Sequence, residues 1–434
     1  MSAVNEFVGE VPPAAGAVAD MSLPSAIRRP RGRLPRRLRS MLALEDFERL
    51  AGRHLPRFLL GFVEGGVEGN ATRAANRAAF AALNFRPRVL VDTTRRSQDT
   101  TLFSRRYAAP FGIAPMGATA LSAREGDLAL ARAAGGADIP FILSGASLVP
   151  LEAVIAVNPA AWFQAYVPGD RARIGALAER VGRAGFGTLV VTVDVAASAN
   201  RENNVRNGFS LPLRPTPRLA FDALSHPGWL FGTALATFLK SGMPHFENMT
   251  ATRGAPVLSP DAERSHGRRD ALCWADIAWL RQRWPGKLLI KGVLAPEDAR
   301  LARETGLDGV IVSNHGGRQL DFSIASLDAL PAVKAEAGEM AVLLDSGIRR
   351  GTDVLKALAL GADFVFLGRP FLYAVAIGGE AGARHAISLL SEEIDRDLAL
   401  LGCSSLAELG PNLLAPSPHR LLPSAASEGG SAGY

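Results

Sequence analysis

The chain has 434 residues, of which 48% are hydrophobic and 21% charged, so it can bury a large core and is not a disordered protein. Its formal net charge is +6, but seven arginines fall between Arg28 and Arg39, and the remainder carries +6 − 7 = −1. This balance excludes a body built to wrap nucleic acid, which needs basic residues spread along one face. The two cysteines exclude a disulfide framework and a zinc cluster.

The two ends of the chain differ in composition from its middle. Residues 1–40 are rich in alanine and proline and then in arginine, which predicts a disordered arm. No apolar segment follows the Arg28-Arg29 pair, so the pair does not indicate export. An alternative function for the arm is attachment to acidic lipid or to an acidic partner. Residues 416–434 are rich in serine and glycine and predict a flexible tail.

Helical periodicity begins after the arm. Apolar residues from Leu44 to Phe62 recur at helical spacing until the Gly65-Gly66 pair interrupts them, which predicts an N-terminal helical extension.

An alternation of short β-rich runs and alanine-rich helical stretches then follows. The runs are Phe111–Pro115, Pro140–Ser144, Trp162–Tyr166, Leu189–Asp194, Leu288–Lys291, Gly309–Ser313, Val342–Asp345 and Phe364–Gly368. The helical stretches between them include Arg124–Gly135, Arg171–Gly185, Ala275–Trp284, Pro296–Gly306 and Thr352–Gly361. The runs are almost entirely apolar, as expected for strands covered on both faces. Eight such units predict an α/β fold, a closed (β/α)8 TIM barrel over residues 41–415, with a doubly wound sheet as the alternative.

The connection after the fourth strand is far longer than an ordinary loop, and residues 209–270 form its main insertion. Within it, Gly228–Leu239 is apolar but shorter than the roughly 20 residues that span a bilayer. Two interpretations remain open for this segment. It is either a helix buried under the connection or a segment that enters a membrane interface.

Polar side chains gather where the strands end, which is where barrel enzymes place their active sites. These residues are Ser144, Gln164, Tyr166, Thr192, Asp194, Lys291, Ser313, Asn314, His315 and Asp345. Burying so many polar groups along one edge is unfavourable unless a polar ligand meets them. The pattern therefore predicts a functional site at this edge.

The segment SNHGGRQLD after the sixth strand suggests the chemistry of that site. His315 can titrate near neutral pH and suits a general base, and Asp194 could orient it and stabilise its protonated form. The planar fork of Arg318 suits a carboxylate. Together these residues predict a proton-abstracting base beside an anion clamp.

Glycines and arginines after the last two strands predict a phosphate site. Small residues at Ser346, Gly347 and Gly368 let backbone N–H groups approach a phosphate, while Arg349 and Arg369 add positive charge. Lys291, in an apolar strand of a chain with few lysines, could form a Schiff base or hold charge beside a cofactor, and the barrel alone does not decide.

The motifs SNHGGRQLD and DSGIRRGTDVLKALALGA, supported by IAPMGAT, FQAYV, TVDV and LIKGV, resemble the FMN-dependent 2-hydroxy acid dehydrogenase/oxidase family. This family includes glycolate oxidase, L-lactate dehydrogenase and mandelate dehydrogenase, and the resemblance runs from about Ala43 to Leu414. It implies FMN as the cofactor and the oxidation of an L-2-hydroxy acid to the 2-oxo acid, without a metal.

The resemblance also implies roles for individual residues. His315 accepts a substrate proton with Asp194 behind it, Arg318 and Arg201 bind the substrate carboxylate, and Tyr166 hydrogen-bonds the substrate hydroxyl region. Lys291 lies at the N1/O2 edge of the flavin, which favours its cofactor role over a Schiff base. The implied cofactor-binding residues are Pro115, Met116, Gly117, Ser144, Gln164, Thr192 and Ser313 towards the isoalloxazine, and Asp345, Gly347, Arg349, Gly368 and Arg369 towards the ribityl chain and phosphate.

One position departs from the family pattern. Phe62 aligns with a tyrosine whose hydroxyl usually contacts the substrate carboxylate. Loss of that hydrogen bond should cost about 1–3 kcal/mol of binding, which indicates a more apolar or non-standard substrate.

The long fourth connection resembles that of membrane-associated bacterial lactate and mandelate dehydrogenases. Gly117 stands where many oxygen-using members have alanine, so we expect electrons to pass to a quinone or another respiratory acceptor, with an oxygen-using oxidase as the alternative. The resemblance further implies a tetramer. The two cysteines indicate a reducing, cytoplasmic setting, and the arginine arm together with the apolar segment Gly228–Leu239 predicts a peripheral position on the inner face of the cell membrane.

Two other classes of function compete with this interpretation. One is a different FMN- or phosphate-dependent barrel enzyme, such as an isomerase. The other is a binding protein without flavin whose arginine arm docks to membrane or nucleic acid.

Overall fold

The computed structural model of the protein describes residues 34–210, 212–259 and 269–417. Most of the predicted arm and of the predicted tail therefore lies outside the described residues. In the last part of the arm, Arg36–Leu38 forms a 3-10 helix (η1), and Leu38 is buried against Gly378. The packed chain thus includes residues before Met41.

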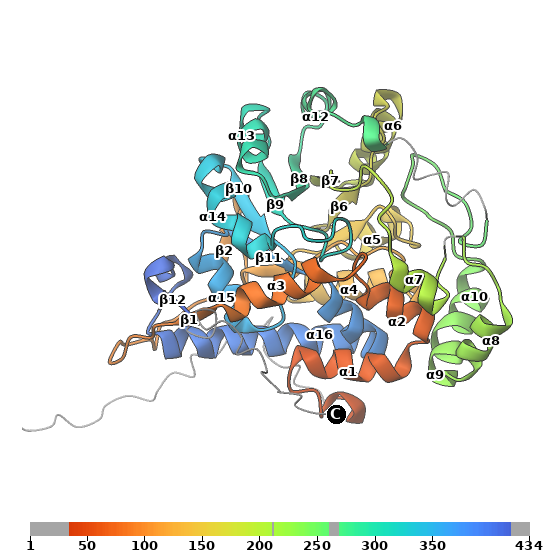
Figure 1. Cartoon of the computed structure of the whole chain (residues 1–434), viewed down its shortest axis with the longest axis horizontal. Coiled ribbons are helices and arrows are strands. Elements are labelled where there is room, and N and C mark those ends of the chain that lie inside the picture. The colour runs from red at the N-terminus through yellow and green to blue at the C-terminus, as the bar shows by residue number, and fades with distance from the viewer. Residues whose placement is uncertain (1–33, 211, 260–268, 418–434) are drawn as a thin grey trace, which may run out of the picture.

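Eight parallel strands form a barrel at the centre of the molecule (Figure 1). They are β4 (Phe111–Ile113), β5 (Ile142–Ser144), β6 (Trp162–Ala165), β7 (Thr188–Thr192), β8 (Lys287–Val293), β9 (Gly309–Val312), β10 (Ala341–Leu344) and β11 (Phe364–Leu367). β11 pairs with β4, and a parallel bridge between Ile113 and Phe141 joins β4 to the chain that enters β5. The ring is therefore closed, which confirms the predicted barrel and excludes the doubly wound sheet.

Helices surround the strands, as expected for strands that are apolar on both faces. They are α4 (Gly126–Gly136), α5 (Leu151–Val157), α6 (Arg171–Ala184), α12 (Trp274–Arg281), α13 (Pro296–Glu304), α14 (Ser326–Ala337), α15 (Gly351–Ala359) and α16 (Arg369–Leu401). The helical stretches named from the sequence correspond to α4, α6, α12, α13 and α15. The backbone of α16 is interrupted at Gly379, whose φ is 56°.

The N-terminal extension consists of α1 (Leu44–His54), α2 (Arg57–Glu64) and α3 (Ala71–Ala81). α1 packs along α16, and α3 lies against the chain that follows β9. β1 (Leu83–Phe85) then pairs antiparallel with β12 (Leu414–Pro416), close to the end of the described chain. A hairpin of β2 (Thr100–Leu102) and β3 (Arg105–Tyr107) adds Leu102 and Tyr107 to the apolar cluster inside the barrel.

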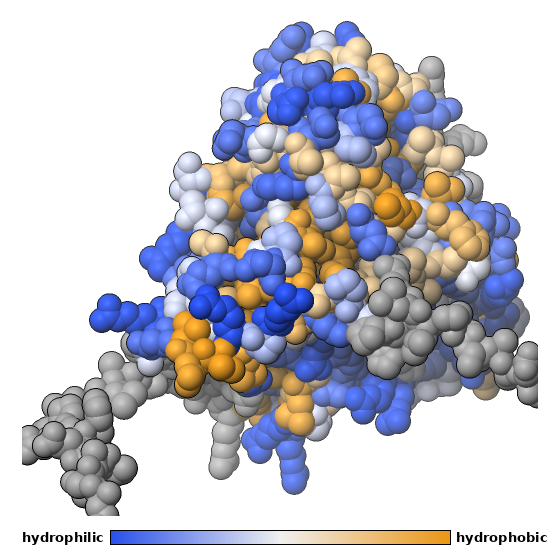
Figure 2. All heavy atoms as spheres, turned by 60° about the vertical axis from the view of Figure 1, so that its left-hand side comes forward, coloured by the Kyte–Doolittle hydropathy of each residue, from blue (hydrophilic) through white to orange (hydrophobic). Residues whose placement is uncertain are grey.

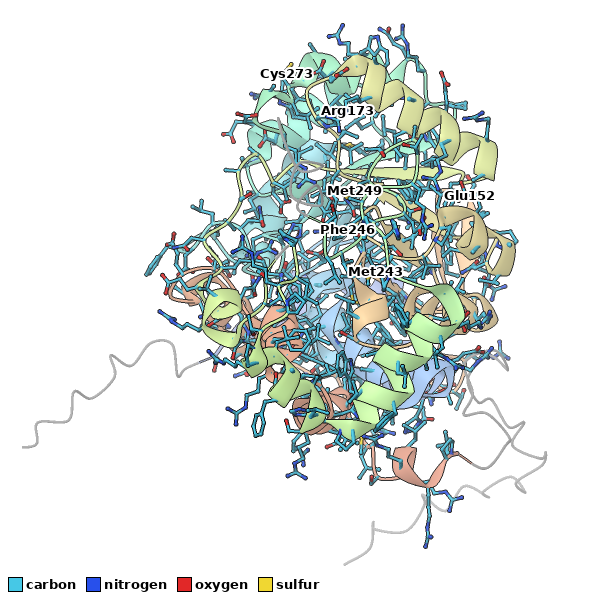
Figure 3. The ribbon with its side chains drawn as sticks, turned by 90° about the vertical axis from the view of Figure 1, so that its right-hand side faces the viewer. Glu152, Arg173, Met243, Phe246, Met249 and Cys273 are labelled. Carbon is cyan, nitrogen blue, oxygen red and sulfur yellow. The ribbon has the colours of Figure 1, made fainter. Side chains whose placement is uncertain are left out.

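The connection after β7 contains several short helices. They are α7 (Glu202–Asn207), α8 (Pro217–Leu224), α9 (Pro227–Trp229), a π-helical segment η3 (Leu230–Leu235), α10 (Ala236–Ser241) and the 3-10 turn η4 (Arg269–Ala271). α8, α9 and α10 lie together at one side of the molecule (Figure 1). Figure 3 faces this side and shows the labelled Phe246 and Met249, from the same connection, near its middle.

The apolar segment Gly228–Leu239 is helical, and one of its faces is anchored. Trp229 is buried, and its indole N–H donates to the Leu121 carbonyl at 2.8 Å. Phe231 and Leu239, however, are 63% and 75% exposed. The interpretation of this segment as a helix buried under the connection is therefore wrong for its outer face.

The exposed apolar side chains of α8 to α10 form what we call the α8–α10 patch, made of Phe221, Leu224, Phe231, Leu235, Phe238 and Leu239. Figure 2 turns the left-hand side of Figure 1 forward, whereas α8–α10 lie at the right of Figure 1. On the face shown in Figure 2, hydrophilic side chains surround smaller groups of hydrophobic ones. In the described part of the chain, no helix is both long and apolar enough to cross a membrane.

Leu289 in β8 is fully buried in the cluster inside the barrel. We expect Leu289→Ala to lower the free energy of unfolding by about 2–5 kcal/mol, since it leaves a cavity that the closed ring cannot collapse to fill. Urea denaturation followed by circular dichroism measures the change. Leu301→Ala, at a position on α13 that is 37% exposed, is the control and should cost less. An equal loss in both variants would contradict the described packing of β8.

Candidate active site

A cavity lies at the C-terminal ends of the barrel strands, between them and the N-terminal extension. Including the open space at its mouth, its volume is about 890 Å³. The predicted site residues that line it are Phe62, Pro115, Met116, Gly117, Tyr166, Thr192, Lys291, His315, Arg318, Asp345, Gly347, Arg349, Gly368 and Arg369. Asp194, Ser313, Ser144, Gln164 and Arg201 lie behind or beside this lining.

His315 and Asp194 form a partly buried pair at the ends of β9 and β7. The Nδ1 atom of His315 lies 3.0 Å from Oδ1 of Asp194. Gly292 makes room for the pair, because its φ is 110° and a Cβ there would lie 2.6 Å from the Cβ of Asp194. The carboxylate therefore fixes Nδ1 and leaves Nε2 as the ring nitrogen available to a ligand.

His315 and Asp194 each shift the pKa of the other. Burial lowers the pKa of His315 below its ordinary value, although the carboxylate of Asp194 offsets part of this effect. Burial alone would raise the pKa of Asp194, but the charge of His315 and its hydrogen bond, with Lys291 nearby, bring that pKa below its ordinary value. The pair thus holds a neutral imidazole beside an ionised carboxylate, which suits a general base.

Lys291 on β8 is 4% exposed and is held by two partners. Its Nζ donates to Ser313 Oγ at 2.7 Å and lies 3.0 Å from Oδ2 of Asp345. Burial opposes its charge, but Asp345 and Asp194 outweigh burial and raise the pKa of Lys291. A Schiff base needs a neutral amine, so this geometry favours a fixed positive charge at the cavity wall.

Arg318 and Arg201 stand beside the histidine. Arg318 donates to the backbone carbonyls of Val63 and Gly65, at 3.2 and 2.7 Å. Arg201 donates to the Arg318 carbonyl and to Oε1 of Gln319, at 3.2 and 2.7 Å. Burial, and then the neighbouring charge of Arg201, place the pKa of Arg318 well below its usual range. Two adjacent guanidinium groups with no carboxylate contact among the described residues form a ready anion site.

Phe62 lies beside Arg318. The Cζ atom of Arg318 is 5.2 Å from the centre of the Phe62 ring, which stacks on Phe209 at 4.2 Å between centroids. Tyr166 is on the other side, with its ring centroid 6.5 Å from that of His315. Phe62 thus places an apolar ring beside Arg318, where a tyrosine would place a hydroxyl that could contact an anion.

The far end of the cavity is basic. Arg369 donates to the carbonyls of Val63 and Gly316 at 2.9 and 3.0 Å, and burial lowers its pKa to about 10. The guanidinium of Arg349 lies near Glu48, at 3.6 Å. Gly347 has a φ of 88°, and a Cβ there would lie 2.7 Å from the Asn76 carbonyl oxygen. This end joins a further cavity lined by Arg73 and Arg77 of α3, which periodicity alone could not place there.

Gln164 has an unused hydrogen-bond donor. Its Oε1 accepts from Ser144 Oγ at 3.1 Å, whereas its Nε2 is buried with no partner in the described structure. A buried amide N–H₂ without an acceptor is costly, so it indicates a polar ligand edge.

The complete residue set fits FMN. It combines a buried cation at Lys291, an unpaired amide donor at Gln164, and two arginines at the end that the sequence assigns to phosphate.

Some lining residues were not named from the sequence. Val63, Gly316, Ile348 and Leu372 contribute mainly through backbone position or shape, which no motif reports. Arg269 of η4 was also missed: it borders the adjoining cavity with Arg201, and the connection that carries it has no periodic pattern.

The chain is similar to known proteins over most of its length. Residues 51–416 match the family described as FMN-dependent dehydrogenase. The L-lactate dehydrogenase of Pseudomonas aeruginosa is 41% identical over 377 residues, which cover 86% of this chain and 97% of the relative. The (S)-mandelate dehydrogenase of Pseudomonas putida is 38% identical over 376 residues, which cover 86% of this chain and 94% of that protein.

Solved structures show the same similarity. A crystal structure described as the monotopic membrane protein (S)-mandelate dehydrogenase matches with a TM-score of 0.80 and 38% identity, covering 87% of this chain and 100% of that chain. A mandelate oxidase structure matches with a TM-score of 0.72 and 35% identity, covering 87% and 98%.

The pairing of His315 with Asp194 predicts a titration. NMR should give a pKa for His315 below its ordinary value of about 6.5, and Asp194→Asn should lower it further, because the carboxylate favours the protonated ring. Asp328→Asn, which removes the same charge from the exposed side of α14, is the control and should leave that pKa unchanged. A higher His315 pKa in Asp194→Asn would show that the carboxylate does not act on this ring.

Proposed function

Because this chain belongs to the family of FMN-dependent dehydrogenases, we propose that it oxidises a lactate- or mandelate-like L-2-hydroxy acid to the 2-oxo acid and passes the electrons to a quinone or another respiratory acceptor. The FMN-dependent oxidation of a 2-hydroxy acid follows from the family and its relatives. The enantiomer, the substrate and the acceptor are the proposal. The observation that supports it most is a base, His315, that shares one cavity with Arg318 and Lys291.

FMN would be held along the cavity by the residues that the sequence assigned to it. Pro115, Met116 and Gly117 after β4 would lie along the ring system with Thr192, while Gln164 offers its free amide N–H₂. Gly347, Arg349, Gly368 and Arg369 would hold the ribityl chain and phosphate, together with Asp345. Bound FMN supplies the acceptor for the two electrons that leave the substrate.

His315 is the proposed base. With Nδ1 held by Asp194 at 3.0 Å, its Nε2 can accept a proton from the substrate as the 2-hydroxy acid becomes the 2-oxo acid. The resulting imidazolium is stabilised by the ionised Asp194, which is already buried against it. Lys291 keeps a positive charge in the wall of the same cavity, where negative charge would develop on the cofactor side.

Arg318 and Arg201 are the proposed carboxylate clamp. Their guanidinium groups are fixed from behind by backbone carbonyls and by Gln319, so little entropy is lost when an anion binds. Tyr166 faces His315 across the cavity and is placed to contact the substrate hydroxyl. A carboxylate bound between the arginines would therefore present its neighbouring carbon to His315.

The α8–α10 patch supports a membrane-bound acceptor. Its six apolar side chains are exposed on helices of the long connection, and the nearby Lys240 of α10 is ion-paired with Glu125. A similar solved structure is described as a monotopic membrane protein. We therefore place the enzyme peripherally on the inner face of the cell membrane, where a quinone is within reach. The tetramer expected from the resemblance remains a prediction.

An oxygen-using oxidase is the second candidate, supported by the similarity to a mandelate oxidase. Against it, this chain has Gly117 where the resemblance leads us to expect alanine in many oxygen-using members. A Cβ at this position would lie 3.0 Å from the Cβ of Ala146, so the wall is closely packed around a glycine.

Anaerobic flavin bleaching tests the substrate class. L-Lactate or L-mandelate should reduce the bound flavin, and their D-enantiomers should not. His315→Ala should slow the reduction by roughly 10²–10⁴-fold, the usual contribution of a general base. If no L-2-hydroxy acid bleaches the flavin, the proposed substrate class is wrong. Reoxidation that is as fast with O2 as with a quinone analogue would instead favour the oxidase.

Vesicle flotation tests the membrane role of the α8–α10 patch. Phe231→Ser with Leu239→Ser should weaken binding to anionic phospholipid vesicles at least about tenfold, because two exposed apolar side chains no longer enter the interface. Val89→Ser with Leu90→Ser, which removes two apolar residues that are even more exposed and lie far from the patch in sequence, is the control. Equal binding by both double variants and the parent would exclude the patch as the anchor.

A further inference from the structure

Arg269 is a cation at the mouth of the active site that the proposed mechanism does not use. It begins the turn η4, where the long connection returns towards α12. The Cζ atom of its guanidinium lies 4.6 Å from the centre of the Tyr166 ring. It borders one cavity together with Arg201, His315 and Arg318.

The hydrogen-bonding capacity of Arg269 is not satisfied by the protein. Its Nη2 is buried and has no hydrogen-bond partner within the part of the chain that the structure describes. The neighbouring Asp270 also borders the cavity, but it is exposed, and no ion pair joins it to Arg269. Burial lowers the pKa of Arg269, which Tyr166 opposes in part, yet the group remains a cation near neutral pH. A half-buried guanidinium with a free N–H is prepared for an anion.

Arg269 does not belong to the pair that clamps the first carboxylate. Arg201 and Arg318 are joined directly, since Arg201 donates to the Arg318 carbonyl at 3.2 Å. Arg269 instead approaches the cavity from the far end of the connection and is held against the face of Tyr166. Two guanidinium groups are enough to bind one carboxylate, so the guanidinium of Arg269 is available to bind a different group of the substrate.

With the substrate bound in this way, its side chain would extend towards Arg269. With the carboxylate at Arg318 and the 2-hydroxyl at His315, the remaining substituent must enter the adjoining cavity, whose walls include Phe209, Phe246 and Arg269 of the long connection. Phe246 lies near the middle of this side of the molecule in Figure 3. The connection therefore supplies the surface that meets the substituent.

We propose that Arg269 is a specificity-determining residue that binds a second anionic group at the end of the substrate side chain, so that the enzyme favours dicarboxylic L-2-hydroxy acids. This inference rests on the proposed function and refines its substrate class. The walls of Phe62 and Phe209 contact the carbon chain between the two carboxylates, and Arg269 pairs with the terminal one.

Matched substrates test the proposal in the holoenzyme. L-Malate and L-2-hydroxybutyrate have the same number of chain carbons and differ in whether the chain ends in a carboxylate or a methyl group. We expect kcat/KM to be roughly 10–100-fold higher for L-malate, as a hydrogen-bonded charge pair usually provides. Arg269→Gln should remove most of this preference while leaving kcat/KM for L-2-hydroxybutyrate within about twofold, and Arg269→Lys should restore part of it.

Arg173→Gln is the control for general charge, because Arg173 is an exposed residue on the same side of the molecule in Figure 3 and does not border the cavity. It should leave the preference for L-malate intact. A parent enzyme that does not prefer L-malate over L-2-hydroxybutyrate overturns the proposal. An equal loss for both substrates in Arg269→Gln also overturns it, since Arg269 would then serve the shared carboxylate or the fold. If neither substrate nor L-lactate reduces the flavin, the proposed function itself has failed, which is a separate result.

Discussion

The site depends on two pairs of ionisable groups that cross the C-terminal ends of neighbouring strands. Asp194 after β7 pairs with His315, and Lys291 on β8 pairs with Asp345 after β10. Lys291 and Asp345 are both buried, and removing one partner of such an ion pair typically costs about 3–5 kcal/mol, because the other charge is left buried alone. The barrel can keep these charges only together, so their spacing is fixed by the strands rather than by flexible loops. This is why the proposed base, a fixed cation and their carboxylates can be held in place before any ligand binds.

Three parts of the chain contribute to the site in different ways. The barrel supplies the reacting groups and their charges. The N-terminal extension closes one wall: Asn76 of α3 exchanges two hydrogen bonds of 2.8 Å with Asn314, the residue before His315. The long connection supplies Arg201, Arg269 and the α8–α10 patch. The groups proposed for the chemistry are thus built on rigid strands, whereas those proposed to contact the substrate side chain and the membrane reside on an insertion that can vary without disturbing the strands.

The sequence predicted the barrel and the position of the site well, because buried parallel strands leave a strong pattern and their polar ends are few. His315 and Lys291 could be named from such patterns, while the assignment of Arg201 and Phe62 needed the family resemblance. Arg269 could not be predicted, since no periodicity determines the path of the connection that carries it. The carbonyls of Val63 and Gly65, which position Arg318 and Arg369, could not be predicted either, because every residue has such a group. The exposure of Phe231 could not be predicted either, because it depends on which face of its helix packs against the rest of the protein, and the composition of an apolar segment does not indicate that face.

The pairing of β1 with β12 has a consequence for synthesis of the protein. Leu83 and Pro416 are register partners, so a strand made early waits for one made last. The exchange between Asn76 and Asn314 imposes a similar delay on α3. On the ribosome, the N-terminal helices must therefore remain without their final partners until nearly the whole barrel has emerged, and their apolar faces are available to chaperones throughout that time. Emergence of α16 and β12, rather than the folding of any single β-α unit, is then the event that gives the N-terminal helices their partners and completes the candidate cavity.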